Sequence, residues 1–75
     1  MDFERITRDP RIMGGKPCIR GTRVTVGTIL GLLSSGASIE AVLRDYSYLT
    51  EADIRAALGY AAWLAEETES ELLSA

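Results

Sequence analysis

The chain has 75 residues and a formal net charge of −3, with one cysteine and no histidine. One cysteine cannot form an internal disulfide, and the lack of histidine removes the commonest metal ligand and the commonest general base. A lone thiol also fits a reducing compartment, so we expect a cytoplasmic protein. A domain this small has a small core. We therefore expect it to associate, as a homodimer or in a tight complex with another chain.

Charge is divided unevenly along the sequence. Residues 1–23 have a formal charge of +3, whereas residues 24–75 have one of −6. This division suggests two faces with different partners, although a solvated surface without any partner gives the same counts. No apolar run approaches the roughly 18 residues that a membrane span needs. The sequence therefore predicts a soluble protein with no membrane partner.

The first segment, residues 1–25, has the character of extended chain broken by turns. Asp9-Pro10 and Gly14-Gly15 are turn sequences, and the short runs around Ile6 and Ile19 alternate as strands do. A ribbon of two or three short strands is not stable alone, so we expect it to lie on the rest of the domain. Cys18, within the second run, is interpreted as a buried and inert thiol.

Two helices are predicted next. The first begins at Thr25 or Gly27 and ends at Gly36, since glycine commonly follows the last helical turn. The second begins after Ser38, a good N-cap residue. Each helix has one apolar stripe. The stripes are Val26, Ile29, Leu30 and Leu33 in the first helix, and Ile39, Val42, Leu43 and Tyr46 in the second.

The third predicted helix is the longest. It opens at the sequence Thr50-Glu51-Ala52-Asp53, a variant capping box with aspartate where glutamate is usual, and runs to about Glu66. Its expected apolar face comprises Ile54, Leu58, Ala61 and Ala65. The acidic tail 67–75 has three alternatives: a frayed terminus, an extension of the helix in solvent, or an arm that orders on a partner. A frayed terminus is the safer expectation.

Taken together, the pattern predicts one mainly α domain over residues 1–66. It consists of a β/turn segment, 1–25, and a three-helix bundle, 26–66, with the acidic tail 67–75 after it. The short connection between the second and third helices has the outline of a helix-turn-helix unit. A three-helix bundle without any nucleic-acid role has the same pattern, so this alternative stays open.

The glycine-rich stretch does not match a nucleotide cradle. Gly14-Gly15-Lys16 is similar to part of a phosphate-binding loop, but Pro17 stands where that loop needs serine or threonine. Proline has no N–H to donate to a phosphate oxygen. The acids show no paired catalytic arrangement, and Cys18 has no base to activate it. We therefore expect no enzyme activity, no catalytic residue, no metal and no cofactor.

Binding is the remaining class of function. The candidate DNA-phosphate contacts are Arg11, Lys16, Arg20, Arg23 and Arg55, with Arg44 as a possible helper. Arg20 and Arg23 would point to opposite faces of an extended chain, so one of them is expected to pair internally. Glu51 and Asp53 at the start of the third helix disfavour base reading there. The candidate contacts to a protein partner are Tyr60, Trp63, Glu66, Glu67, Leu72 and Leu73.

The string from Ile6 to Val26, with the core GGKPCIRGTR, resembles the small bacterial family catalogued as domain of unknown function 433. The resemblance covers about residues 4–65. It implies a homeodomain-like three-helix fold preceded by a short β element. It also implies an antitoxin, since members are regarded as antitoxins encoded beside a PIN-like ribonuclease toxin. The motif falls on Gly15, Lys16, Pro17, Arg20, Gly21, Thr22 and Arg23, and no catalytic role comes with it.

Three functions therefore stand side by side. The leading hypothesis is an antitoxin-like binding protein that neutralises a cognate PIN-like ribonuclease and binds operator DNA as a complex. The alternative is a stand-alone DNA-binding transcriptional regulator. The third is a structural dimerisation module.

Overall fold

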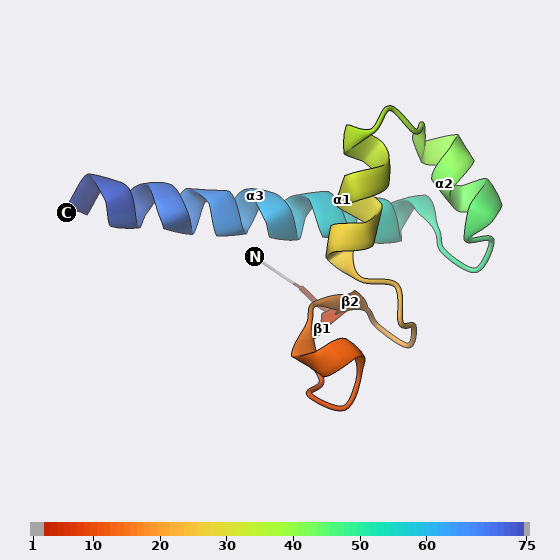
Figure 1. The fold of residues 1–75 in the computed structure, drawn as a ribbon, viewed down its shortest axis with the longest axis horizontal. Helices are drawn as coiled ribbons and strands as arrows, with labels where there is room; N and C mark the ends of the chain where they lie inside the picture. Colours follow the sequence, from red (N-terminus) through yellow and green to blue (C-terminus); the bar gives the residue numbers. More distant parts are fainter. Residues whose placement is uncertain (1–2, 75) are drawn as a thin grey trace.

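The computed structural model describes the backbone of residues 3–74 and the side chains of residues 3–67. Two short strands and three α-helices form a two-stranded ribbon and a helical bundle, which confirms the predicted fold class (Figure 1). The elements are β1 Ile6–Thr7, the 3₁₀ turn η1 Met13–Gly15, β2 Cys18–Ile19, α1 Val26–Ser34, α2 Ile39–Asp45 and α3 Glu51–Ser74. The ribbon, α1 and α2 lie along the N-terminal half of α3, and α3 extends beyond them (Figure 1).

The boundaries of α1 agree with its predicted signals. Thr25 is the N-cap, and its Oγ1 accepts a hydrogen bond from the N–H of Thr28 at 3.0 Å. At the other end Gly36 has a φ of 102°, a conformation that favours glycine, and the N–H of Ala37 donates to the carbonyl of Leu32 at 3.1 Å. This is the Schellman arrangement, which satisfies carbonyls that the helix leaves unpaired.

The start of α2 is also as predicted, but the end of α3 is not. Ser38 caps α2, because its Oγ accepts from the N–H of Ala41 at 3.0 Å. In contrast, α3 does not end near Glu66 but continues to Ser74. The segment after Glu66 contains no glycine or proline and is rich in glutamate and leucine, which are good helix formers. Of the three alternatives for this segment, the structure shows the extended helix.

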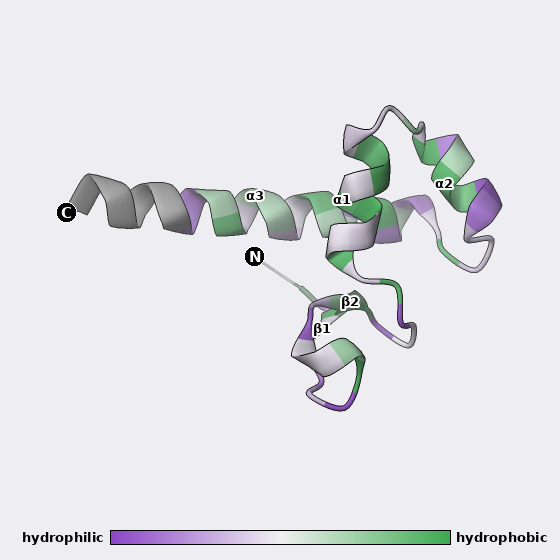
Figure 2. Ribbon diagram, viewed as in Figure 1, coloured by the Kyte–Doolittle hydropathy of each residue, from purple (hydrophilic) through white to green (hydrophobic). Residues whose placement is uncertain are grey.

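The hydrophobic core lies where the three helices and the ribbon meet, and hydrophobic residues are found on each of these elements (Figure 2). Ile29 of α1, Val42 of α2 and Ile54 of α3 are its largest fully buried aliphatic side chains. The expected apolar face of α3 is wrong at Leu58, which is 41% exposed, whereas Ala61 of the same face is half-buried. The buried positions that follow Ile54 are Ala57 and Tyr60. Ala65, also expected on the buried face, is exposed.

The ribbon is held on α3 by aromatic packing. Strands β1 and β2 pair antiparallel with Ile6 opposite Ile19, and both side chains are buried in the core. Just before β1, the ring of Phe3 lies edge-on to Tyr60 at 5.2 Å and to Trp63 at 5.3 Å. Phe3 and the ribbon cover the side of α3 that carries Tyr60, so Tyr60 lies on the buried face of the helix.

The second strand also carries the cysteine. Cys18 is fully buried, as predicted, and its Sγ lies 3.4 Å from the carbonyl oxygen of Lys16. A single β-bridge joins Cys18 to Thr25, so the ribbon continues toward α1 without forming a third strand. Over the part of the chain that the structure describes, no helix combines the length and apolar character that crossing a bilayer requires.

Candidate functional site

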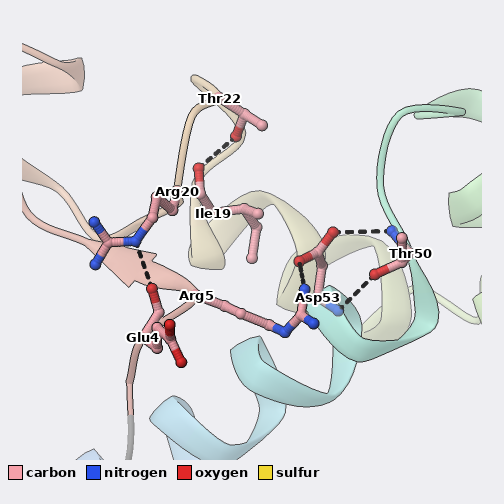
Figure 3. A network of polar contacts seen from close by, with 7 residues as sticks. All are labelled: Glu4, Arg5, Ile19, Arg20, Thr22, Thr50 and Asp53. Atoms are coloured by element: carbon pink, nitrogen blue, oxygen red, sulfur yellow. Dashed lines mark hydrogen bonds and ion pairs between the residues drawn. The ribbon is translucent and has the colours of Figure 1, made fainter.

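Asp53, in the first turn of α3, forms hydrogen bonds to two separate parts of the chain. Its Oδ2 accepts from the N–H of Thr50 at 2.9 Å, and its own N–H donates to Thr50 Oγ1 at 3.3 Å (Figure 3). These two bonds form the capping box that the sequence predicts. The second carboxylate oxygen, Oδ1, accepts from the Arg5 guanidinium at 3.1 Å. Asp53 therefore caps α3 and at the same time ties the N-terminal ribbon to it.

The glycine-rich motif shapes the two turns that flank β2. Gly15 and Gly21 have φ values of 86° and 80°, which side chains of L-residues rarely adopt. In the second turn, Thr22 Oγ1 donates to the carbonyl of Ile19 at 2.8 Å (Figure 3). It also accepts from the N–H of Val24 at 3.0 Å. These residues of the motif therefore have a clear structural task, which is to set the path of the ribbon from β1 to α1.

The structure separates the two arginines of the motif. Arg20 points back across the ribbon and donates from Nε to the backbone carbonyl of Glu4 (Figure 3). The expected internal pairing therefore falls on Arg20, although its partner is a carbonyl and not an acid. Arg23 is exposed, and it makes no ion pair with any side chain in residues 3–67. Of the two, Arg23 is the better placed for a phosphate.

Two other candidate DNA contacts are engaged within the chain. Arg11 forms hydrogen bonds to both carboxylate oxygens of Asp9, and its backbone N–H also donates to that carboxylate. The side-chain and backbone bonds of Arg11 lower the pKa of Asp9 below its usual 3.8. Arg55 pairs with Glu51, one turn earlier on α3, at 2.9 Å. Both arginines would have to leave a neighbouring acid to contact DNA.

The remaining cations are exposed. Lys16, like Arg8 and Arg44, forms no ion pair with the described side chains. Arg8, Lys16 and Arg23 therefore remain as solvent-facing cations of the N-terminal segment, whereas Arg44 lies in the last turn of α2, where a cation is favourable for the helix dipole.

The predicted partner contacts fall into three groups. Tyr60 is only 4% exposed and packs inside the domain, and Trp63 is half-buried against Phe3. Both rings thus serve internal packing. Glu66 and Glu67 are exposed on the extending part of α3. The side chains of Leu72 and Leu73 lie outside the described residues.

The surface of the described residues includes a polar hollow and an apolar groove. One, of about 350 Å³, is polar and lies over the network of Figure 3. It is lined by Glu4, Arg5, Arg20 and Asp53. The other, of about 590 Å³, is a mainly apolar groove between the start of α1 and the middle of α3, with Lys16 in its wall. In the described residues no cluster of three or more acids and cysteines has the arrangement of a metal site.

Comparison with known proteins agrees with this architecture. Residues 6–61 match the family described as protein of unknown function, DUF433. The uncharacterized protein y4eO of Sinorhizobium fredii (strain NBRC 101917 / NGR234) is 40% identical over 58 residues, which are 77% of this chain and 26% of that protein. The chain thus spans about a quarter of the length of this curated relative.

A solved structure is similar over nearly the whole chain. It is the crystal structure of a DUF433 member protein from Anabaena variabilis ATCC 29413, with a TM-score of 0.79 and 32% sequence identity. The similarity covers 92% of this chain and 68% of that one. The two-stranded ribbon and the three helices are therefore features that this chain shares with another member of the same family.

Proposed function

We propose that this chain, which belongs to the DUF433 family, is an antitoxin-like binding protein that neutralises a PIN-like ribonuclease toxin. The family description names no activity, so the proposal depends on the surface of the molecule and on the antitoxin role that the resemblance implies. In this proposal the ribbon and the bundle are a scaffold, and the extending part of α3 makes the contact with the toxin.

The observation that supports the proposal is the exposed acidic face of α3. Glu66 and Glu67 are exposed and belong to the C-terminal half of α3. That end of the helix extends beyond the ribbon, α1 and α2 (Figure 1). A ribonuclease binds a polyanion, so its substrate groove carries cations. A helix with carboxylates on its outer face is complementary to such a groove in shape and charge. Binding there would exclude RNA from the enzyme.

The test is coexpression with the neighbouring open reading frame. We expect the two products to copurify, and this chain to restore growth to cells that express the toxin. A Glu66→Lys/Glu67→Lys variant is expected to lose both effects, because its lysines repel the basic groove. Circular dichroism should show the helix content unchanged, since both positions are exposed.

A matched control carries the same change of charge elsewhere. The Glu40→Lys/Asp45→Lys variant alters two exposed acids of α2, and we expect it to copurify and to protect cells as the wild type does. If both variants lose binding, net charge and not the α3 face is responsible. If the wild-type chain does not bind the neighbouring product at all, the proposal is wrong.

A second candidate, a stand-alone DNA-binding regulator, is favoured by the three solvent-facing cations of the N-terminal segment, Arg8, Lys16 and Arg23. It predicts that the purified chain alone retards its upstream DNA, with an affinity that falls steeply as salt is raised. Arg23→Ala is expected to weaken binding more than Arg55→Ala, because Glu51 already engages Arg55. Absence of a shift at low salt would exclude this candidate.

A further inference from the structure

The loop that joins β1 to β2, residues 8–17, lies on the far side of the ribbon from the three helices (Figure 1). We call it the ribbon loop. Because Thr7 pairs with Cys18, the two ends of the loop lie side by side. Its three cations and one acid give it a formal charge of +2, within a chain whose net charge is −3. A basic loop at the edge of an acidic molecule is a candidate contact with a polyanion.

Hydrogen bonds within the ribbon loop fix its shape. The N–H of Ile12 donates to the carbonyl of Asp9 at 2.9 Å, and the N–H of Gly15 donates to the carbonyl of Ile12 at 3.0 Å. The carboxylate of Asp9 accepts three hydrogen bonds from Arg11, so the acid of the loop is already neutralised within it. The loop is therefore ordered before a partner arrives, which lowers the entropy lost on binding.

Met13 is unusual in this loop in two respects. Its side chain is 46% exposed, so it adds little to the core of the domain. Its φ is 51°, in the left-handed region, and Gly14 and Gly15 follow it with φ values of 67° and 86°. Glycine adopts this conformation freely, whereas a residue with a side chain is strained there. A turn that only reversed the chain would therefore be more stable with glycine at all three positions.

We propose that the ribbon loop binds double-stranded DNA in the minor groove, with Met13 as an apolar wedge against the bases. Arg8 and Lys16 contact the phosphates on either side. Both are exposed and form no ion pair with the described side chains. Methionine is among the side chains that minor-groove proteins insert between base steps, and the insertion kinks the duplex. The inference rests on the second candidate function, DNA binding by the N-terminal segment, and adds how the DNA is held.

The apolar area of the loop favours DNA over an anionic membrane, the other extended polyanionic surface. Of the large hydrophobic side chains in residues 8–17, only Met13 is exposed. One methionine side chain buries too little apolar area to hold a protein on a bilayer. A minor groove is narrow, accepts a single wedge, and has phosphates along both of its walls.

The first test is fluorescence anisotropy with a labelled A·T-rich duplex over a series of salt concentrations. Met13→Gly is expected to weaken DNA binding about 10-fold, because it removes the apolar contact of one methionine side chain. The salt dependence should stay as in the wild type, since no phosphate contact is lost. Lys16→Ala, in contrast, should reduce the slope of log affinity against log salt by about one. Thermal unfolding should show Met13→Gly to be at least as stable as the wild type, because glycine suits a positive φ.

Leu58→Ala is the matched control, since Leu58 is 41% exposed but lies on α3. We expect it to bind the duplex as the wild type does, and a larger loss there than in Met13→Gly would assign the contact to α3 and overturn the proposal. Binding that Met13→Gly leaves unchanged would also overturn it, while the DNA-binding candidate would stand. No binding by the wild type at low salt would exclude both, as would binding only to phosphatidylserine vesicles. The toxin contact of α3 is independent of all these outcomes.

The second test measures bending, by energy transfer between dyes at the two ends of the duplex. At saturating protein the wild type is expected to raise the transfer, because a wedge between base pairs kinks the DNA. Met13→Gly should still bind at saturation through Arg8 and Lys16 but leave the duplex nearly straight. Equal transfer in the two complexes would show that Met13 is not a wedge and would overturn the proposal.

Discussion

Replacing Ile54 by alanine is expected to lower the free energy of unfolding by about 3–4 kcal/mol, within the range measured when a fully buried aliphatic side chain is truncated. Ile54 has no exposed surface and belongs to the one core that the three helices and the ribbon share. The total stability of small domains is typically about 5–15 kcal/mol, so the loss is a large fraction of it. Urea denaturation followed by circular dichroism measures the change.

Leu58→Ala is the matched control for this prediction. Leu58 lies one turn further along α3 and is 41% exposed, so its truncation removes less apolar contact from the core. We expect a loss of about 1 kcal/mol or less, since half-exposed sites are tolerant. Equal losses at Ile54 and Leu58 would contradict the buried face that the structure assigns to α3.

The parts of the fold that sequence reasoning predicts are those with local signals. The caps at Thr25, Ser38 and Thr50 form hydrogen bonds three residues away, so their evidence lies in a single short window. The Schellman turn at Gly36 is similarly local. Alternation and flanking turns also predict the two strands, and the structure places them at Ile6 and Ile19.

The buried face of α3 could not be predicted in this way. A stripe of Ile54, Leu58, Ala61 and Ala65 and a stripe of Ile54, Ala57 and Tyr60 both have helical spacing. The choice between them is made by Phe3 and the ribbon, which lie about fifty residues earlier in the sequence and cover the side of Tyr60. No pattern within the sequence of α3 indicates the contact between Tyr60 and Phe3.

The ion pairs of the arginines show the same difference between contacts that are close in sequence and contacts that are distant. The pairing of Arg11 with Asp9 spans two residues, and that of Arg55 with Glu51 spans four, so both were accessible to sequence reasoning and lessen the case for these arginines as DNA contacts. Arg5 and Asp53 are 48 residues apart, and nothing near either residue indicates the other. Sequence reasoning therefore misses the ion pair between Arg5 and Asp53, which joins the ribbon to α3.

The ion pair between Arg5 and Asp53 is the basis of the second large effect that we expect on stability. Asp53→Ala is expected to lower the free energy of unfolding by about 2–3 kcal/mol, since it removes the capping-box bond to the Thr50 N–H and the charge-assisted hydrogen bond from Arg5 together. Asp53 is only 8% exposed, and both of its carboxylate oxygens are bonded. Arg5→Ala removes the ion pair alone. We expect it to cost about 1 kcal/mol, because the Arg5 side chain is 53% exposed and screened by water.

A double-mutant cycle separates the two roles of Asp53. If Asp53 holds Arg5, Arg5→Ala has almost no further effect in the Asp53→Ala variant, and the coupling is about 1 kcal/mol. Glu51→Ala is the control, since it breaks an exposed pair of the same helical turn and should cost about 0.5 kcal/mol or less. Hydrogen exchange adds a direct readout, because Arg5→Ala should weaken protection of the bonds between β1 and β2 before those of α1. Zero coupling with unchanged exchange would mean that the ribbon is held by the aromatic contacts of Phe3 and not by this ion pair.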